Sequence, residues 1–192
     1  MVFLNRIYTK TGDGGFTAVG DGSRVSKLDL RIVAGGSVDE LNCLLGVAAA
    51  VPGSEALAGR LRSLQQQLFD LGADLSVPLP DSGDDRCPRI SSDHVTQLEH
   101  EIDDLVAGLT PLTSFVLPGG SQTGAFLHLA RSVCRRAERD AFALSEQQPI
   151  NTMIPVFLNR LSDLLFVMAR HANQGGTADV LWQPGTGTQP PS

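Results

Sequence analysis

The chain has 192 residues, of which 42% are hydrophobic; this is enough for one sizeable core and predicts a single domain. A formal net charge of −6 argues against nucleic-acid binding through a broad phosphate-neutralising surface, although it leaves room for a local basic patch. No apolar run approaches the ~20 residues of a bilayer span, and the opening residues become polar too soon for a signal peptide, so we expect a soluble, cytoplasmic protein with no membrane partner.

The first distinctive segment is a stretch of ten residues, 8–17, that holds three glycines, three threonines and one lysine. Glycines let successive backbone N–H groups point into one concavity, where hydroxyl and ammonium donors can join them around a phosphate. The GxxxxGK[ST] spacing is absent, and no predicted strand precedes the segment. The pattern alone therefore favours a flexible leader over a phosphate site.

Two amphipathic helices follow Lys27. The first carries an apolar face of Val38, Leu41, Leu45 and Ala48, and Pro52 and Gly53 end it. The second carries leucines from 57 to 75 at alternating steps of four and three residues, which is typical of a helix-bundle seam. Residues 76–90 then contain three prolines and a charged run, which predicts an exposed connection.

Three more helices complete the predicted fold. The third has an apolar stripe from Val95 to Leu109, the fourth is expected over about 121–144, and the fifth over about 152–171. Nothing after Gly175 has helical periodicity, so we expect a loosely docked tail there. Because alternating strand and helix patterns are absent, we predict an all-α fold, an antiparallel bundle of five helices.

The predicted fourth helix carries an unusual charge cluster. Arg131, Arg135 and Arg139 are spaced four residues apart, so they lie along one side of the helix and repel one another unless an anion compensates them. A triphosphate is one such anion. The alternative is a solvated face on which Glu138 pairs with a neighbour.

Polar residues also interrupt the first and fifth helices. Gly35, Asp39, Asn42 and Gly46 lie along one line of the first helix, which indicates close approach of either another helix or a ligand. Asp39 is a candidate partner for an arginine of the fourth helix. The amide of Asn159 in the fifth helix is suited either to reading a ligand or to fixing helix register through an interhelical hydrogen bond.

Cysteines and histidines give no sign of a metal site. The four histidines are dispersed and no Glu-x-x-His pair of a di-iron bundle occurs. Cys43, Cys87 and Cys134 show no CxxC spacing, so neither disulfides nor a zinc site is expected. Cys43 and Cys134 lie among apolar neighbours and are predicted to be small core residues.

Six blocks, taken together and in order, resemble one family, the ATP:corrinoid adenosyltransferases of the PduO type. The blocks are residues 8–13, 24–27, 37–42, 115–120, 134–139 and 157–163. The resemblance spans most of the chain. It implies a ferritin-like five-helix bundle with an irregular N-terminal nucleotide-binding loop, divided into an ATP-binding leader (1–26), the bundle (27–173) and an irregular tail (174–192) of one domain.

The resemblance also implies an activity. The enzyme transfers the 5′-deoxyadenosyl group of ATP to cob(I)alamin and so forms adenosylcobalamin and triphosphate. Mg²⁺ accompanies the phosphates. The expected assembly is a homotrimer with ATP and the corrinoid at each subunit interface. A cobalt reductase and an adenosylcobalamin-dependent enzyme are further expected partners.

The resemblance assigns roles residue by residue. Phe115 is similar to the aromatic residue that displaces the corrin's lower axial ligand, Asp39 is expected to pair with Arg131, and Arg135 to contact the triphosphate. Arg136 belongs either to the nucleotide clamp or to the trimer contact. The expected nucleotide-binding residues are Thr9, Lys10, Thr11, Gly12, Thr17, Ala18, Lys27, Arg135, Arg136, Glu138, Arg139 and Asn159.

The sequence departs from the family pattern at Ala18, where a hydroxyl residue is usual, and at 34–37, where an aromatic residue and a threonine are usual. One rival interpretation is a nucleotide sensor or corrinoid chaperone that keeps the bundle and lacks turnover. A structural helical adaptor is a third interpretation, which leaves the arginine row and the leader without a purpose.

Overall fold

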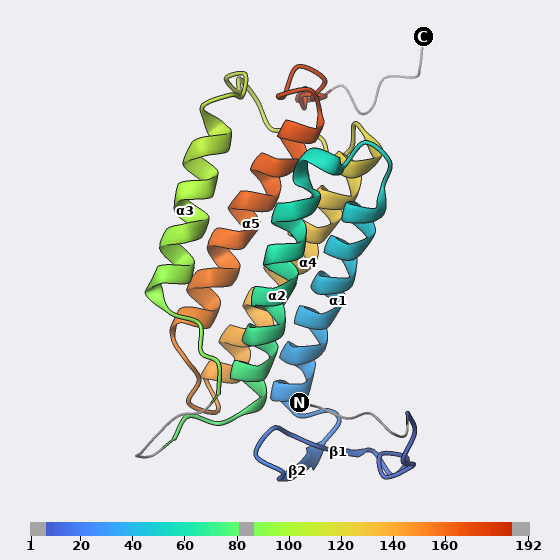
Figure 1. Ribbon diagram of the computed structural model, residues 1–192, viewed down its shortest axis with the longest axis vertical. Coiled ribbons are helices and arrows are strands. Elements are labelled where there is room, and N and C mark those ends of the chain that lie inside the picture. Colours follow the sequence, from blue (N-terminus) through green and yellow to red (C-terminus); the bar gives the residue numbers. More distant parts are fainter. Residues whose placement is uncertain (1–6, 81–86, 186–192) are drawn as a thin grey trace.

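Five long helices dominate the structure, a computed structural model that describes residues 7–80 and 87–185. They are α1 (Leu30–Ala50), α2 (Glu55–Ser76), α3 (Ser92–Val106), α4 (Gln122–Ser145) and α5 (Met153–Ala172). Each helix runs opposite to the one before it in the chain (Figure 1). The predicted all-α antiparallel bundle is therefore confirmed.

The helices begin where local chemistry allows it. The Asp29 carboxylate accepts a hydrogen bond from the Arg31 amide at 2.8 Å, and the Ser121 hydroxyl accepts one from the Gly124 amide at 3.0 Å, so α1 and α4 each have a capped first turn. Pro155 lies in the first turn of α5, where a missing N–H costs nothing.

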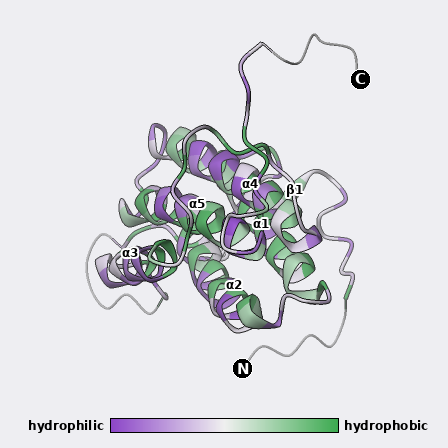
Figure 2. Cartoon of the chain, turned by 90° about the horizontal axis from the view of Figure 1, so that it is seen from above, coloured by the Kyte–Doolittle hydropathy of each residue, from purple (hydrophilic) through white to green (hydrophobic). Residues whose placement is uncertain are grey.

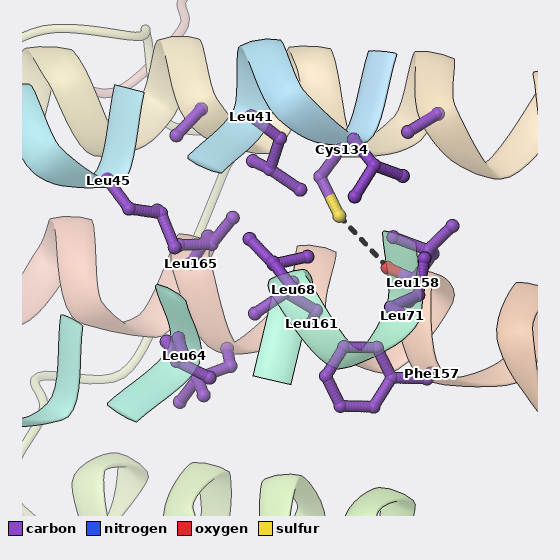
Figure 3. Packing of buried hydrophobic residues seen from close by; sticks show 14 of the residues in the cluster. Leu41, Leu45, Leu64, Leu68, Leu71, Cys134, Phe157, Leu158, Leu161 and Leu165 are labelled. Carbon is purple, nitrogen blue, oxygen red and sulfur yellow. Dashed lines mark hydrogen bonds between the residues drawn. The ribbon is translucent and has the colours of Figure 1, made fainter. Parts of the chain in front are cut away.

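The helices pack in a simple order. α1 contacts α2 and α4, α4 also contacts α5, and α3 lies against α5 at the margin of the bundle (Figure 2). The leucine seam of α2 faces inward and meets Leu41 and Leu45 of α1 and Phe157 of α5 (Figure 3). α1 is long and apolar enough to cross a membrane by length and composition, but here it is a core helix whose apolar face is buried against α2 and α4.

Cys134 is a buried member of this core, as predicted. Its thiol donates a hydrogen bond to the Leu158 carbonyl at 3.1 Å (Figure 3), and burial raises the pKa of the thiol far above its ordinary value, so it stays protonated. Cys43, in contrast, is exposed on α1, so its predicted core position is wrong. Cys43 lies one position beyond the buried face that Leu41 and Asn42 share.

Two further expectations need correction. The leader is not wholly irregular, since β1 (Phe16–Ala18) and β2 (Arg24–Ser26) pair as an antiparallel hairpin below the lower end of α1 (Figure 1). The connection after α2 is not exposed throughout, because Ile90 is buried. Part of that connection, residues 81–86, lies outside the described residues.

A buried carboxylate fastens this connection to the lower end of the bundle. Asp74 accepts hydrogen bonds from the Arg89 guanidinium at 2.7 Å, the Ile90 amide at 2.9 Å and the Asn151 side chain at 2.7 Å. The network joins the end of α2 to the segments that precede α3 and α5. Full hydrogen bonding is what makes a buried carboxylate tolerable.

Candidate functional site

The leader, which comprises the β1–β2 hairpin and the residues before it, brings polar donors together next to Lys27. A Cβ atom built on Gly12 would lie 3.1 Å from the Lys27 ammonium nitrogen, so the lysine lies directly against the glycine. The hydroxyls of Thr9 and Thr11 are 2.8 Å apart, and Arg24 donates to the Thr11 carbonyl at 2.7 Å. An ammonium, a guanidinium and two hydroxyls thus meet on an exposed surface, where an anion could be held.

The remaining predicted leader residues lie around this group. Lys10 adopts a left-handed backbone with φ of 60° and is exposed, and Thr17 lies half-buried in β1. Ala18 lines a pocket of about 410 Å³ between the hairpin and the α1–α2 face, together with Arg31 and Gly35. The leader therefore rests on the bundle beside the small residues that the sequence singled out in α1.

Arg131, Arg135 and Arg139 follow one side of α4, as their spacing predicted. Among residues 7–80 and 87–185, none of the three forms an ion pair with a carboxylate. The Arg139 guanidinium donates to the Arg135 carbonyl at 2.8 Å, and the buried Nε of Arg131 has no hydrogen-bond partner in that part of the chain. The row spans ~12 Å along the helix axis and carries uncompensated positive charge.

Two other charged residues of α4, Arg136 and Glu138, bond to side chains of the neighbouring helices α1 and α5. Arg136 forms an ion pair with Glu40 of α1, and Asn159 of α5 donates to the Glu138 carboxylate at 3.0 Å. These bonds join α4 to α1 and α5. The structure thus shows the interhelical role that the sequence left open for Asn159, and the expected nucleotide contacts of Arg136, Glu138 and Asn159 stay predictions.

A pocket of about 640 Å³ lies beside α4. Phe115, Trp182 and Phe166 form its aromatic wall, and Arg131 lines it from α4. The Phe115 and Trp182 rings lie 6.2 Å apart at an interplanar angle of 60°, and Phe115 is 78% exposed. Large aromatic side chains left open on the surface mark a binding site for an apolar ligand or a partner.

His128 lies one turn before Arg131 on α4 and is buried. Its ring meets Phe166 edge-on at 6.0 Å between centroids, and neither ring nitrogen has a hydrogen-bond partner among the described residues. Burial and the adjacent Arg131 lower the pKa of His128, and Asp179 opposes them. The imidazole is therefore neutral at pH 7 and lies beside two residues that line the pocket.

The predicted pair of Asp39 and Arg131 does not form within this chain. Asp39 is exposed and lines a groove between α1 and α2 with Phe69 and Gly72, whereas Arg131 lines the aromatic pocket. Likewise, no hydrogen bond or ion pair within the described part of the chain joins the leader to the arginine row. The arginine row is thus joined neither to the leader nor to Asp39 by such bonds among the described residues.

Trp182 and the tail that carries it were not predicted as part of the site. Trp182 is the single tryptophan of the chain and follows a segment rich in glycine, so the rarity of the residue was the one available signal. The described part of the tail is not loosely docked, because its backbone pairs with the Phe115 loop. Residues 186–192 lie outside the described residues.

Comparison with known proteins gives a consistent result. Residues 7–172 match the family described as cobalamin adenosyltransferase. A corrinoid adenosyltransferase from Mycobacterium leprae is 49% identical over 96% of this chain and 98% of its own length. A cobalamin adenosyltransferase from Cupriavidus metallidurans is 46% identical over 94% of this chain and 95% of its own length.

Solved structures show the same likeness. A variant of the PduO-type ATP:corrinoid adenosyltransferase from Lactobacillus reuteri, complexed with cobalamin and ATP, superimposes with a TM-score of 0.87. Its sequence is 36% identical, and the match covers 93% of this chain and 97% of that protein. A second variant of that enzyme, complexed with ATP, superimposes with a TM-score of 0.84 at 36% identity over 92% of this chain and 100% of that one.

Proposed function

The chain belongs to the cobalamin adenosyltransferase family, and we propose that it divides its two substrates between the ends of the arginine row on α4. The reaction is transfer of the adenosyl group from ATP to a corrinoid. Reduced cobalt attacks the 5′ carbon of ATP, a cobalt–carbon bond forms, and the bond from that carbon to oxygen breaks, so triphosphate leaves with the electron pair. The attacking electrons belong to the corrinoid, so no protein nucleophile is required.

The observation that carries this division is the position of Arg131. It lines the aromatic pocket and also begins the arginine row, so an apolar cavity and a cationic strip are continuous along one helix. A corrin ring suits the cavity beside Phe115 and Trp182, where an aromatic side chain can exclude a lower axial ligand from cobalt. The triphosphate suits Arg135 and Arg139, one and two turns further along.

The leader completes the nucleotide site. Lys27 and the donors around Gly12 hold the phosphates from the side opposite α4, with Thr17 and Ala18 at the edge. Because no bond joins the leader to the row within the described part of one chain, we place the site between subunits of a homotrimer.

The same assembly gives the remaining charged residues a role. Asp39 of one subunit, which is exposed and forms no ion pair with an arginine among the described residues of its own chain, pairs with Arg131 of the next. Arg136 and Glu138 support the row from behind, since their bonds to Glu40 and Asn159 hold α4 in place.

Preorganised cations explain how this arrangement accelerates the reaction. Negative charge develops on the departing triphosphate, and fixed guanidinium and ammonium groups stabilise it more than they stabilise bound ATP. Exclusion of water by the aromatic wall strengthens these interactions. Holding the reacting atoms in line supplies a further part of the acceleration.

Mg²⁺ fits this site as a companion of the triphosphate. Among the described residues, no group of three or more histidine, cysteine, aspartate or glutamate side chains gathers to form a protein cage. Mg²⁺ commonly keeps several waters and binds through substrate phosphates. When bound, the ion neutralises phosphate charge, while Lys27 and Arg135 orient the chain of phosphates.

The chemistry also implies neighbours in the cell. Cobalt must be reduced to the Co(I) state before it can attack, so a cobalt reductase supplies the substrate. An adenosylcobalamin-dependent enzyme consumes the product. A soluble protein in the cytoplasm meets both requirements, because ATP and reducing power are present there.

The reaction and the arginine row can be tested together. With Mg-ATP and chemically reduced cobalamin, the protein should yield a light-sensitive alkylcobalt spectrum and free triphosphate. Arg135→Ala should lower kcat/KM for ATP about 100-fold, the cost typical of losing one preorganised charge donor in a transition state. The matched control is Arg62→Ala on the exposed face of α2, which should leave kcat/KM within about twofold.

Two outcomes would contradict this assignment. Equal losses in the two variants would place the triphosphate away from Arg135. Corrinoid binding without triphosphate release would favour the chaperone interpretation over the enzyme.

A further inference from the structure

The tail is joined to the Phe115 loop by backbone pairing. The Trp182 amide donates to the Phe115 carbonyl at 2.7 Å, and the Leu117 amide donates to the Val180 carbonyl at 2.8 Å, which makes an antiparallel bridge. The Ser114 hydroxyl adds a third hydrogen bond, to the Trp182 carbonyl at 2.7 Å. Phe115 and Trp182, two of the three aromatic residues in the pocket wall, are therefore held as one unit, although they lie far apart in the sequence.

A buried ion pair anchors this unit to the bundle. The Arg170 Nε of α5 donates to the Asp179 carboxylate at 2.7 Å, and the two side chains are 6% and 2% exposed. The same guanidinium donates to the Thr110 carbonyl at 2.6 Å, at the start of the segment that leads to Phe115. Arg170 therefore holds both of the paired segments.

Asn173 extends the anchor to α4. Its side chain donates to the Asp179 carboxylate and to the Gly119 carbonyl, both at 3.1 Å, and accepts a hydrogen bond from the Ser121 amide at 2.9 Å. A Cβ atom on Gly120 would collide with this side chain, so only glycine fits at position 120 of the loop. Asn173 thus fixes the loop, the tail and the N-cap of α4 relative to one another.

We propose that Asp179, Arg170 and Asn173 are positioning residues that hold Phe115 and Trp182 as the wall of the corrinoid pocket. The proposal rests on the proposed function for the identity of the ligand. None of the three residues lines the pocket, so they act through the two aromatic residues. A buried ion pair is weak evidence for stability in itself, and fixing one geometry is the use that suits this location.

The single tryptophan makes the proposal measurable without substrate. Trp182 is 45% exposed, so acrylamide quenching of its fluorescence reports how firmly the wall is held. Asp179→Asn should raise the quenching constant. It should also raise KM for the corrinoid about fivefold and leave KM for ATP within about twofold, since the arginine row is not part of the network.

The matched control is Asp74→Asn. This variant neutralises another buried carboxylate that accepts a hydrogen bond from an arginine at 2.7 Å. Asp74 is near the C-terminal end of α2, and this end of α2 lies at the opposite end of the bundle from the C-terminal end of α5, which Asp179 follows (Figure 1). It should lower the unfolding midpoint while changing neither the quenching constant nor the ratio of the two KM values. Should Asp179→Asn fail to fold, Ser114→Ala removes one hydrogen bond of the wall at the surface and should shift both readouts in the same direction.

Equal changes in the two KM values, or an unaltered quenching constant in both Asp179→Asn and Ser114→Ala, would overturn the proposal. Failure of the proposed function gives a different pattern. In that case the wild type makes no alkylcobalt product, while quenching still separates Asp179→Asn from Asp74→Asn and supports the positioning role.

Discussion

His128 is a buried polar side chain whose position in α4 carries an energetic cost. The ring is 2% exposed, and its nitrogens have no partner among the described residues. A buried polar group without a hydrogen bond typically costs ~1–3 kcal/mol. Burial is the largest cause of the lowered pKa of His128; the neighbouring Arg131 lowers it further, and Asp179 raises it.

This environment predicts a pH dependence of stability. The unfolded state takes up a proton as the pH falls through 6.5, the ordinary pKa of histidine, whereas folded His128 resists protonation. The free energy of unfolding should therefore decrease as the pH falls below 6.5. His128→Leu should remove this contribution and raise the free energy of unfolding by about 1 kcal/mol near neutral pH.

Urea unfolding at neutral pH and at about one unit below the ordinary histidine pKa checks this expectation. His100→Leu is the control, because His100 is exposed on α3. If His128→Leu keeps the same loss of stability between the two pH values as the wild type, another group causes that loss.

At the level of secondary structure, Gly12 and Lys27 flank the β1–β2 hairpin and approach each other closely. Gly12→Ala places a methyl group 3.1 Å from the ammonium nitrogen, so the flexible lysine must shift. Stability should change little, and KM for ATP should rise about threefold, because a displaced charge binds phosphate less well. Gly14→Ala is the matched control, since no atom lies within 4 Å of a Cβ at Gly14.

Steady-state kinetics with ATP as the varied substrate measures the difference. The same increase in KM for both alanine variants would mean that backbone freedom, and not the position of Lys27, controls nucleotide binding.

The elements differ in how well the sequence predicts them. All five helices follow from apolar periodicity, because each buries one face against its neighbours. The hairpin and the docked tail depend on backbone pairing between short segments without periodicity, such as Val116 with Leu181. Periodicity also fails to place Cys43 within its helix, because Cys43 is exposed although the residue before it, Asn42, is buried.

The candidate site was predictable to a similar degree. The spacing of Arg131, Arg135 and Arg139 requires a shared side of α4, and the structure confirms it. Spacing carries no information about Trp182, which reaches Phe115 through the fold of the tail. Nor does spacing reveal that Arg136 pairs with Glu40, because that contact joins two helices far apart in the sequence.

For the molecule as a whole, the proposed site between subunits of a homotrimer predicts complementation between variants. Lys27→Ala and Arg135→Ala should each be nearly inactive alone. In mixed trimers, each site takes Lys27 from one subunit and Arg135 from its neighbour. A site is intact where an Arg135→Ala subunit supplies Lys27 and a Lys27→Ala subunit supplies Arg135. Random mixing of equal amounts produces this arrangement at about one interface in four, so co-expression should recover about a quarter of the wild-type rate.

Product formation by co-purified mixed trimers is the measurement, and separately purified variants combined just before the assay are the control. A mixture as inactive as its components would mean that each site takes both residues from one chain.

The proposed placement of both substrate regions on α4 has a consequence for how the gene can change. Lengthening or shortening the connections between helices leaves the distance between the aromatic pocket and the arginine row unchanged. Inserting one residue between Arg131 and Arg135, in contrast, rotates Arg135 and Arg139 by ~100° about the axis of α4 relative to Arg131. Insertions and deletions in descendants of this chain should therefore accumulate in the turns and be eliminated from this single stretch of helix.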